Sequence, residues 1–442
     1  MVFDCHSDLF TDVTVKTLKG ERNIIKNQER IDMRAYERLL KYVTVRTPSD
    51  ETSTTVPSSS CQFDLAQDLI REFINMGLPK ARTDEKCYVY AQIPATPGYE
   101  NCPKLGFVAH LDTVSDFCDK KIVPVVTENY DGRDLPLGGS DGRVLSVEMF
   151  PHLKDLKGRT LITSNGDTIL GADDKAGVAE IMTMAERVLT EQIPHGPISI
   201  GFTPDEEVGR GADHFDVEKF DADFAYTMDG DTEGEIQYEN FNAADAVFEM
   251  NGVNVHPGSA KDVMVNAALV AMEINSLIPA GETPRDTEDY EGFYHLVQMS
   301  GDVAHAKLHY IVRDHDANQF ARRLDTLREI SKQMNLKWGF GTVKLTIDEQ
   351  YRNMAEVIAN GNMHLIENAK KACLAADVPP LVLPIRGGTD GARLSFMGLP
   401  CPNLGTGGHG YHGPFEHITA EGMDKSVDVM IELVKLYAEM KS

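Results

Sequence analysis

The chain has 442 residues, of which 42% are hydrophobic and 25% charged, a composition typical of globular proteins. Its 69 acidic residues outnumber the 43 basic ones, which leaves a formal net charge of -26. This balance argues against nucleic acids and membranes as partners, because phosphate groups bind to basic surfaces. The length exceeds the range in which one hydrophobic core keeps growing, so we expect two domains.

The cysteines indicate a reducing compartment. There are 7 of them, scattered along the chain without a C-x-x-C pair, which is not the pattern of a disulfide framework. No early segment has the apolar core of a signal peptide, and no window has the length of a membrane span. We therefore expect a cytoplasmic protein.

The first part of the chain predicts an extension followed by helices. Residues 1–30 show little periodicity and are expected to form an N-terminal extension of unassigned role. Helical spacing of apolar residues begins near residue 31, and Phe63–Met76 predicts a second helix that ends at Gly77.

Short apolar runs then alternate with helical patterns. The predicted strands are Leu105–Ala109, Leu161–Thr163, Ile198–Phe202 and Phe224–Met228, and the clearest helix between them is Ala176–Leu189. Strands that alternate with helices predict an α/β fold with a mostly parallel central sheet flanked by helices. In such sheets the functional site lies beyond the carboxyl ends of the strands.

The pattern changes between residues 241 and 352. Here the order strand, helix, strand, strand, helix, strand is typical of a ferredoxin-like α+β unit. We expect it to be inserted into a discontinuous first domain made of residues 31–240 and 353–442. Leu381–Ile385 predicts a further strand there, and Ala420–Met440 a closing helix. A cleft between two domains is a usual place for a small ligand.

Candidate functional residues stand in short turns, most of them directly after an apolar run. Imidazoles and carboxylates without thiolates are the ligand set of a hydrolytic two-metal site. The candidates are His110, Asp112, Asp173, Glu206, Glu207, Asp229 and His412.

The spacing of these residues suggests separate tasks. Asp112 lies two residues after His110, so both point the same way on a strand end and Asp112 can hold the second imidazole nitrogen. Asp173 lies two residues after Gly171 and opens a helix, where a carboxylate can bridge two cations or cap the helix. Glu206 and Glu207 are adjacent and cannot point the same way, so one can bind a metal while the other serves as general base.

The remaining candidates lie in two glycine-rich segments and in the inserted unit. His412 lies in a glycine-rich segment with His409 and His417 as alternatives, and the form Tyr-His-Gly places His412 first. Arg386 opens the run Arg-Gly-Gly-Thr-Asp-Gly before a helix, which suits an anionic group. A phosphate is disfavoured because no Walker-type lysine follows. His256 and Arg313 are further candidates in the inserted unit.

From about Met33 to its C-terminus the chain resembles the M20 metallopeptidases, which have a zinc-exopeptidase-like catalytic domain and an inserted lid. The last four of the stretches that follow resemble the tripeptide aminopeptidases of that family in particular. The stretches are Gly171–Gly177, Thr203–Gly211, Tyr238–Asn242, Asn254–Gly258, Tyr290–Leu296 and Ile385–Ala392.

The resemblance implies two zinc ions per subunit and a role for each candidate. His110 and Asp229 would bind one ion, Glu207 and His412 the other, and Asp173 would bridge them. Asp112 would support the site, and Glu206 would be the general base. Arg313 and Arg386 would hold the carboxyl end of a small peptide, and His256 would stabilise the oxyanion. The inserted lid would also form a homodimer.

The resemblance leaves alternatives to a tripeptide aminopeptidase. A related M20 dipeptidase or N-acyl-amino-acid deacylase would use the same metals with a differently shaped cleft. A non-catalytic peptide-binding protein is disfavoured, because binding alone does not require Glu206.

Overall fold

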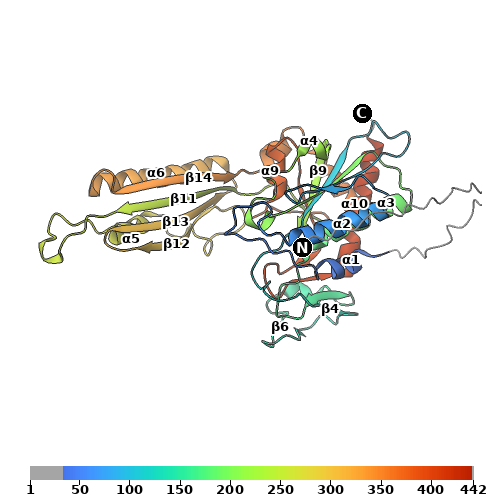
Figure 1. Cartoon of the computed structure of the whole chain (residues 1–442), viewed down its shortest axis with the longest axis horizontal. Helices are drawn as coiled ribbons and strands as arrows, with labels where there is room; N and C mark the ends of the chain where they lie inside the picture. The colour runs from blue at the N-terminus through green and yellow to red at the C-terminus, as the bar shows by residue number, and fades with distance from the viewer. Residues whose placement is uncertain (1–32, 441–442) are drawn as a thin grey trace, which may run out of the picture. The chain divides into compact units, whose positions relative to one another are not determined.

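The computed structural model describes residues 33–440, so the expected extension at residues 1–30 lies outside the described residues. Within that range, no helix combines the length and the apolar character needed to cross a membrane. Two α/β units with separate hydrophobic cores account for most of the described chain (Figure 1).

The first unit is built on an eight-stranded sheet with the order β1-β2-β8-β3-β9-β16-β10-β15. The middle pairs, β8 to β3, β3 to β9 and β9 to β16, are parallel, as the sequence predicts. Antiparallel strands β1 and β2 complete one edge, so the sheet as a whole is mixed. Its strands are β1 (Arg82–Thr83), β2 (Val89–Ile93), β3 (Leu105–His110), β8 (Ile198–Thr203), β9 (Phe224–Gly230), β10 (Glu235–Gln237), β15 (Leu381–Val382) and β16 (Asn403–Gly405).

Helix α3 occupies the centre of the helical layer, against β3 and β9 and between α1 and α10. A side chain at Gly177 of α3 would meet the carbonyl oxygen of Met228 at 2.0 Å, so this helix approaches β9 more closely than a bulkier residue allows. The helices of this unit are α1 (Ala35–Tyr42), α2 (Gln62–Asn75), α3 (Ala172–Thr190), α4 (Val217–Phe220), α7 (Ala355–Ala359), α8 (His364–Ala375), α9 (Asp390–Phe396) and α10 (Ala420–Glu439).

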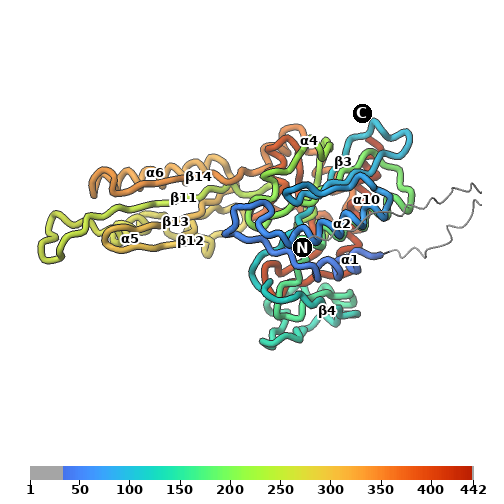
Figure 2. Tube along the Cα trace, in the orientation of Figure 1, coloured from blue at the N-terminus to red at the C-terminus, as the bar shows by residue number. Residues whose placement is uncertain are grey.

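The second unit is an antiparallel sheet with the order β12-β13-β11-β14, packed against α5 and α6. Its chain order confirms the predicted ferredoxin-like arrangement. Its elements are β11 (Asn242–Asn251), α5 (Ala267–Leu277), β12 (Phe293–Gly301), β13 (His305–Asp314), α6 (Ala317–Trp338) and β14 (Val343–Tyr351). Figure 2 follows this excursion from yellow-green to orange along the trace.

Two predicted elements are shorter than expected. The sequence predicts a helix over Val263–Leu277, but α5 begins at Ala267, because the side chain of Asn266 accepts the N–H groups of Ala268 and Leu269 and caps the helix there. Strand β15 ends at Val382, before Pro384, and Ile385 forms only an isolated bridge with Asn240.

A smaller sheet, β17-β18-β7-β4, joins segments that are far apart in the sequence. It pairs the loop around His412 with the strand before α3, since Ile418 pairs with Ile162. The sequence predicts only one of its strands. The remaining elements are β4 (Pro124–Thr127), β7 (Leu161–Ser164), β17 (Gly408–His409), β18 (His417–Thr419), a hairpin of β5 (Leu135–Pro136) and β6 (Val144–Leu145), and the short 3-10 turns Pro151–Lys154, Glu206–Val208 and Pro257–Ser259.

Candidate active site

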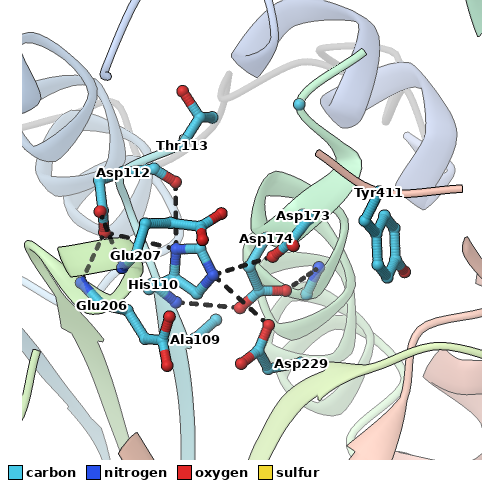
Figure 3. Close-up of polar contacts among 12 residues, drawn as sticks. Ala109, His110, Asp112, Thr113, Asp173, Asp174, Glu206, Glu207, Asp229 and Tyr411 are labelled. Carbon is cyan, nitrogen blue, oxygen red and sulfur yellow. Dashed lines mark hydrogen bonds and ion pairs between the residues drawn. The ribbon is translucent and has the colours of Figure 1, made fainter. Parts of the chain in front are cut away.

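His110 is the last residue of β3, and its imidazole faces two carboxylates from neighbouring elements. Nε2 lies 3.0 Å from Oδ1 of Asp173 and 3.4 Å from Oδ1 of Asp229. Asp229 is the second-last residue of β9, which runs parallel to β3, so the two carboxyl ends meet at one edge of the sheet (Figure 3). The His110 side chain is buried, which fixes its ring in this direction.

Asp173 stands between two imidazoles. Its Oδ1 faces Nε2 of His110, and its Oδ2 lies 3.0 Å from Nε2 of His412. The turn that carries Asp173 is held by Glu416, whose carboxylate accepts the N–H groups of Leu170, Gly171 and Asp173. Sequence reasoning missed Glu416, because its partners lie about 240 residues away.

Asp174 has a supporting position. One of its carboxylate oxygens accepts the backbone N–H of His110 at 2.9 Å, and the other accepts the N–H of Gly177 at 3.2 Å. The second contact resembles the helix-capping role that the sequence left open for this region. The first ties the start of α3 to the end of β3.

Asp112 organises both neighbouring motifs. Its backbone oxygen lies 3.0 Å from Nδ1 of His110, which leaves Nε2 directed at Asp173 and Asp229. Its carboxylate accepts the backbone N–H groups of Glu206 at 3.0 Å and Glu207 at 3.2 Å. Asp112 is fully buried, so this support is shielded from solvent.

Glu206 and Glu207 form a 3-10 turn just after β8, and their side chains diverge. Figure 3 shows their carboxylates on opposite sides of the His110 ring, with that of Glu207 on the side of Asp173. Oε2 of Glu207 lies 3.1 Å from Nε2 of His412, and its buried Oε1 has no hydrogen-bond partner among the described residues. An unpaired buried carboxylate oxygen is costly unless a proton or a cation joins it.

Asp205, just before this pair, has a left-handed backbone with φ of 59°. Its carboxylate accepts hydrogen bonds from the backbone and hydroxyl groups of Ser58 and from the amide of Gln62. The turn is therefore fixed by the loop before α2 and by the first residue of that helix. Sequence reasoning missed this contact as well.

The structure separates His412 from the two alternative histidines. His409 and His417 pair with each other on β17 and β18, and Nε2 of His417 lies 2.9 Å from Nε2 of His152. The ring of His409 lies 4.0 Å from that of His152, so these three imidazoles form a separate cluster. Only His412, whose side chain is 55% exposed, faces Asp173 and Glu207.

Burial raises several pKa values in the site, and neighbouring acids add to the effect. Burial, reinforced by the charge of Asp173, raises the pKa of Glu207 to about 7. Burial raises the pKa of Asp229 to about 6 against the opposing effect of His110. Burial and the charge of Asp229 raise that of Glu206 well above its usual range. Burial alone would raise the pKa of Asp173, but hydrogen bonds with His110 and His412 lower it.

The donor set fits divalent cations. Two groups of side chains each place their ligand atoms within 4.8 Å of one another, namely His110 with Asp173 and Glu207, and His110 with Glu206 and Asp229. His412 adds an imidazole beside Asp173 and Glu207. Imidazole nitrogens and carboxylate oxygens at these separations can hold zinc. The second group brings Glu206 within ligand reach, so distance alone does not separate a base from a ligand.

Two of the predicted substrate residues lie where the two units meet. Arg313, at the end of β13, stacks on Tyr351 with 5.5 Å between its Cζ and the ring centre. A side chain at Gly388, in the loop before α9, would collide with the ring of Tyr351. Arg386 belongs to the same loop and donates hydrogen bonds to the segment between α5 and β12.

His256 is remote from these residues. Arg313 pairs with Ala243 near the start of β11, whereas His256 follows Asn251 at its other end. Eight residues of strand separate the two ends, which is about 27 Å. His256 is exposed, and its Nδ1 accepts only the N–H of Gly258 in the described part of the chain. The structure therefore does not bring His256 to the His110 site within one chain.

Comparison with known proteins matches this geometry to a family. The model of peptidase family M20/M25/M40 matches residues 167–436. A peptidase T of Clostridium novyi is 50% identical over 403 residues, which cover 91% of this chain and 98% of that protein. The chain belongs to the peptidase T group of the M20 family. As an M20 peptidase it is a hydrolase of peptide bonds, and within that class an exopeptidase.

Solved structures extend the likeness to the fold of this M20 peptidase. A tripeptidase of Staphylococcus aureus superposes with a TM-score of 0.73 at 22% identity, covering 92% of this chain and 99% of that one. A dinuclear metal-binding M20 peptidase of Bacillus subtilis superposes with a TM-score of 0.61 at 13% identity, covering 92% and 98%. At these identities the likeness concerns the fold.

Proposed function

We propose that this M20 peptidase is a di-zinc aminopeptidase that removes the N-terminal residue from tripeptides. The observation that carries the proposal is Asp173, whose two carboxylate oxygens each face an imidazole from a different part of the chain. This is the arrangement expected of a carboxylate that bridges two cations. The names of the Clostridium and Staphylococcus relatives, peptidase T and tripeptidase, support the tripeptide substrate.

The metal ligands that we propose are His110, Asp173, Glu207, Asp229 and His412. The B. subtilis neighbour, described as dinuclear, supports two ions. Cations held by these residues would polarise the scissile carbonyl and lower the pKa of an attacking water. Zinc suits this set of nitrogen and oxygen ligands.

Glu206 is the proposed general base. It accepts a proton from the attacking water and returns it to the leaving amine. Its raised pKa, which follows from burial and from the charge of Asp229, favours proton uptake by this carboxylate. Asp112 holds the backbone of Glu206 in place and directs the His110 ring, so its role is to orient both.

Arg313 is the proposed partner of the substrate carboxylate, because a guanidinium binds a carboxylate bidentately. Its Nη1 donates to the backbone oxygens of Ala244 and Val312 within its own sheet. Participation of Arg386, which the sequence predicts, would require release of the backbone oxygens that Arg386 now contacts. His256 is proposed to stabilise the oxyanion.

We further propose that residues 241–352 form a lid and dimerisation domain inserted between residues 31–240 and 353–442. His256 lies too far along the sheet to reach the site of its own chain, so a second copy must supply it. Helix α5 exposes Leu269 and Met272, with 58% and 59% of their surfaces accessible, and β12 is an edge strand. Sedimentation of the purified protein tests this, and a fully active monomer would contradict it.

A cytoplasmic location is proposed from the cysteines, because the cysteines of the described residues are all free and none forms a disulfide. A reducing compartment keeps cysteines in the thiol form.

One experiment tests the substrate. The zinc-loaded protein is incubated with di-, tri- and tetrapeptides of matched sequence, and the products are identified by mass spectrometry. We expect release of the N-terminal residue from the tripeptide alone. Preferential cleavage of the dipeptide or of an N-acyl amino acid would assign the chain to a related M20 activity, and binding without cleavage would indicate a peptide-binding protein.

A further inference from the structure

Both terminal nitrogens of the Arg386 side chain donate hydrogen bonds at the point where the two units meet. Its Nη1 donates to the backbone oxygens of Asp289 at 2.6 Å and Glu291 at 3.2 Å. Its Nη2 lies 3.4 Å from the backbone oxygen and 3.2 Å from the hydroxyl of Thr287. A guanidinium carries two N–H groups on each Nη. All of these terminal donors are therefore used within the segment between α5 and β12.

Aromatic rings hold the same guanidinium from another side. The Arg386 Cζ lies 5.1 Å from the ring centre of Phe241 and 5.9 Å from that of Phe293. Both rings are buried, and they are 5.5 Å apart. His315 packs on Phe241 at 4.2 Å, and its Nε2 lies 3.1 Å from the backbone oxygen of Ile385. Stacking on aromatic faces adds attraction to the hydrogen bonds of an arginine.

The chain passes from the catalytic unit to the inserted unit and back, and hydrogen bonds join these two connections at the same junction. The side chain of Asn240 accepts the N–H of Met354 and donates to the backbone oxygen of Arg352. Asn353 in return accepts the N–H of Asn240, and Asn242 accepts the N–H of Asn353. These reciprocal bonds are buried or half-buried, so the outgoing and returning strands are held together.

Three sequence stretches that we single out for their family resemblance thus converge on one junction. Tyr238–Asn242 supplies Asn240, Phe241 and Asn242, Tyr290–Leu296 supplies Glu291 and Phe293, and Ile385–Ala392 supplies Ile385 and Arg386. None of these contacts involves the residues around His110. The junction therefore has a task separate from metal binding.

That task concerns Arg313. Phe293, which packs beside Arg386, is the direct cross-strand partner of Arg313 on β13. The segment held by Arg386 leads into β12, so its position determines where the end of β13 lies relative to the catalytic unit. We propose that Arg386 is a positioning residue that ties the inserted unit to the catalytic unit and thereby places Arg313. This proposal rests on the proposed function for the carboxylate contact of Arg313.

The test compares Arg386→Gln with Arg313→Gln in the zinc-loaded protein. Two readouts are taken: amide hydrogen exchange of residues 287–293, and kcat/KM for one tripeptide and its C-terminal amide. We expect Arg386→Gln to speed exchange in this segment and to lower kcat/KM for the acid and the amide by the same factor. Arg313→Gln should leave exchange unchanged and reduce the preference for the acid by roughly 10- to 100-fold.

Two milder variants guard against a folding defect. Thr287→Val removes one acceptor of Arg386 and should speed exchange in the same segment without altering the preference for the acid. Arg386→Lys keeps the charge but lacks the planar fork, so it should not restore slow exchange.

The proposal is overturned if Arg386→Gln abolishes the preference for the acid, because Arg386 would then bind the carboxylate itself. It is equally overturned if exchange of residues 287–293 is unchanged in Arg386→Gln. If the unmodified protein cleaves no tripeptide, the proposed function fails. The exchange measurement still decides whether Arg386 connects the inserted unit to the catalytic unit.

Discussion

The carboxylate of Asp112 accepts a hydrogen bond from the backbone N–H of Glu206 at 3.0 Å, although the two residues lie 94 positions apart. The other oxygen of Asp112 accepts the N–H of Glu207, so one buried side chain fixes both acids. Its backbone oxygen also lies 3.0 Å from Nδ1 of His110. Asp112 thus anchors the backbone of both acids and the ring of His110.

Replacing Asp112 with Asn is expected to disturb this arrangement while preserving the size of the side chain. The amide oxygen can accept one backbone N–H, but the NH2 group faces the other donor and repels it. Loss of such a supporting contact typically lowers metal affinity or activity by about 10- to 100-fold. We expect a decrease of that size in kcat/KM. The circular dichroism spectrum should remain that of the unmodified protein, which would show that folding is retained. Normal activity would mean that the backbone of Glu206 needs no such support.

Replacing Glu206 and Glu207 with Gln, one at a time, distinguishes the general base from the metal ligand. Glu206→Gln should retain its metal content while kcat falls by roughly 10²- to 10⁴-fold, because an amide accepts no proton. Glu207→Gln, the matched control on the adjacent residue, should lose metal. Both variants are measured by metal analysis and steady-state kinetics. Loss of zinc in Glu206→Gln with full occupancy in Glu207→Gln would reverse the two assignments.

Metal removal should abolish hydrolysis, and zinc should restore it. Protons compete with cations for the same carboxylates, so metal affinity is expected to fall as the pH decreases. The pKa of Glu207 is about 7 and that of Asp229 about 6, both raised by burial, so the affinity should begin to fall near pH 7 and fall most steeply below pH 6. Competition titration with a zinc chelator across this range measures it. Full activity in a verified metal-free sample would exclude the metal mechanism.

The cluster of His152, His409 and His417 should make the free energy of unfolding decrease as the pH becomes acidic. Burial and the charge of His152 lower the pKa of His417 to about 4, against an unfolded value near 6.5. The unfolded chain therefore binds more protons between these values, and stability is complete above pH 6.5 and lost as the pH falls toward 4. At pH 5 the loss from this residue alone is about 2 kcal/mol.

His417→Phe tests this dependence, because phenylalanine fills similar space and does not titrate. Relative to its own stability at pH 8, the variant should lose less free energy of unfolding at pH 5 than the unmodified protein. Urea denaturation at both pH values gives the comparison. An identical loss of free energy of unfolding between pH 8 and pH 5 in both proteins would show that the cluster does not control the pH dependence of stability.

The sequence by itself determined the elements that carry the site. The apolar run before His110 and the run before Asp229 predict strands, and parallel strands bring their carboxyl ends to one edge. This reasoning placed His110, Asp173, Asp229 and the Glu206–Glu207 pair near one another, as the structure has them. The order of elements in residues 241–352 likewise predicted the second sheet, because period and order are local properties of a chain.

Contacts between distant segments were decided only by the tertiary structure. Nothing in the sequence indicated that Glu416 holds the Asp173 turn, that His409 and His417 face His152, or that Arg386 grips the segment at Thr287. Each of these depends on how two elements pack and in which register, which no local pattern encodes. The distance of His256 from the site has the same origin, since strand pairing sets which end of β11 carries it.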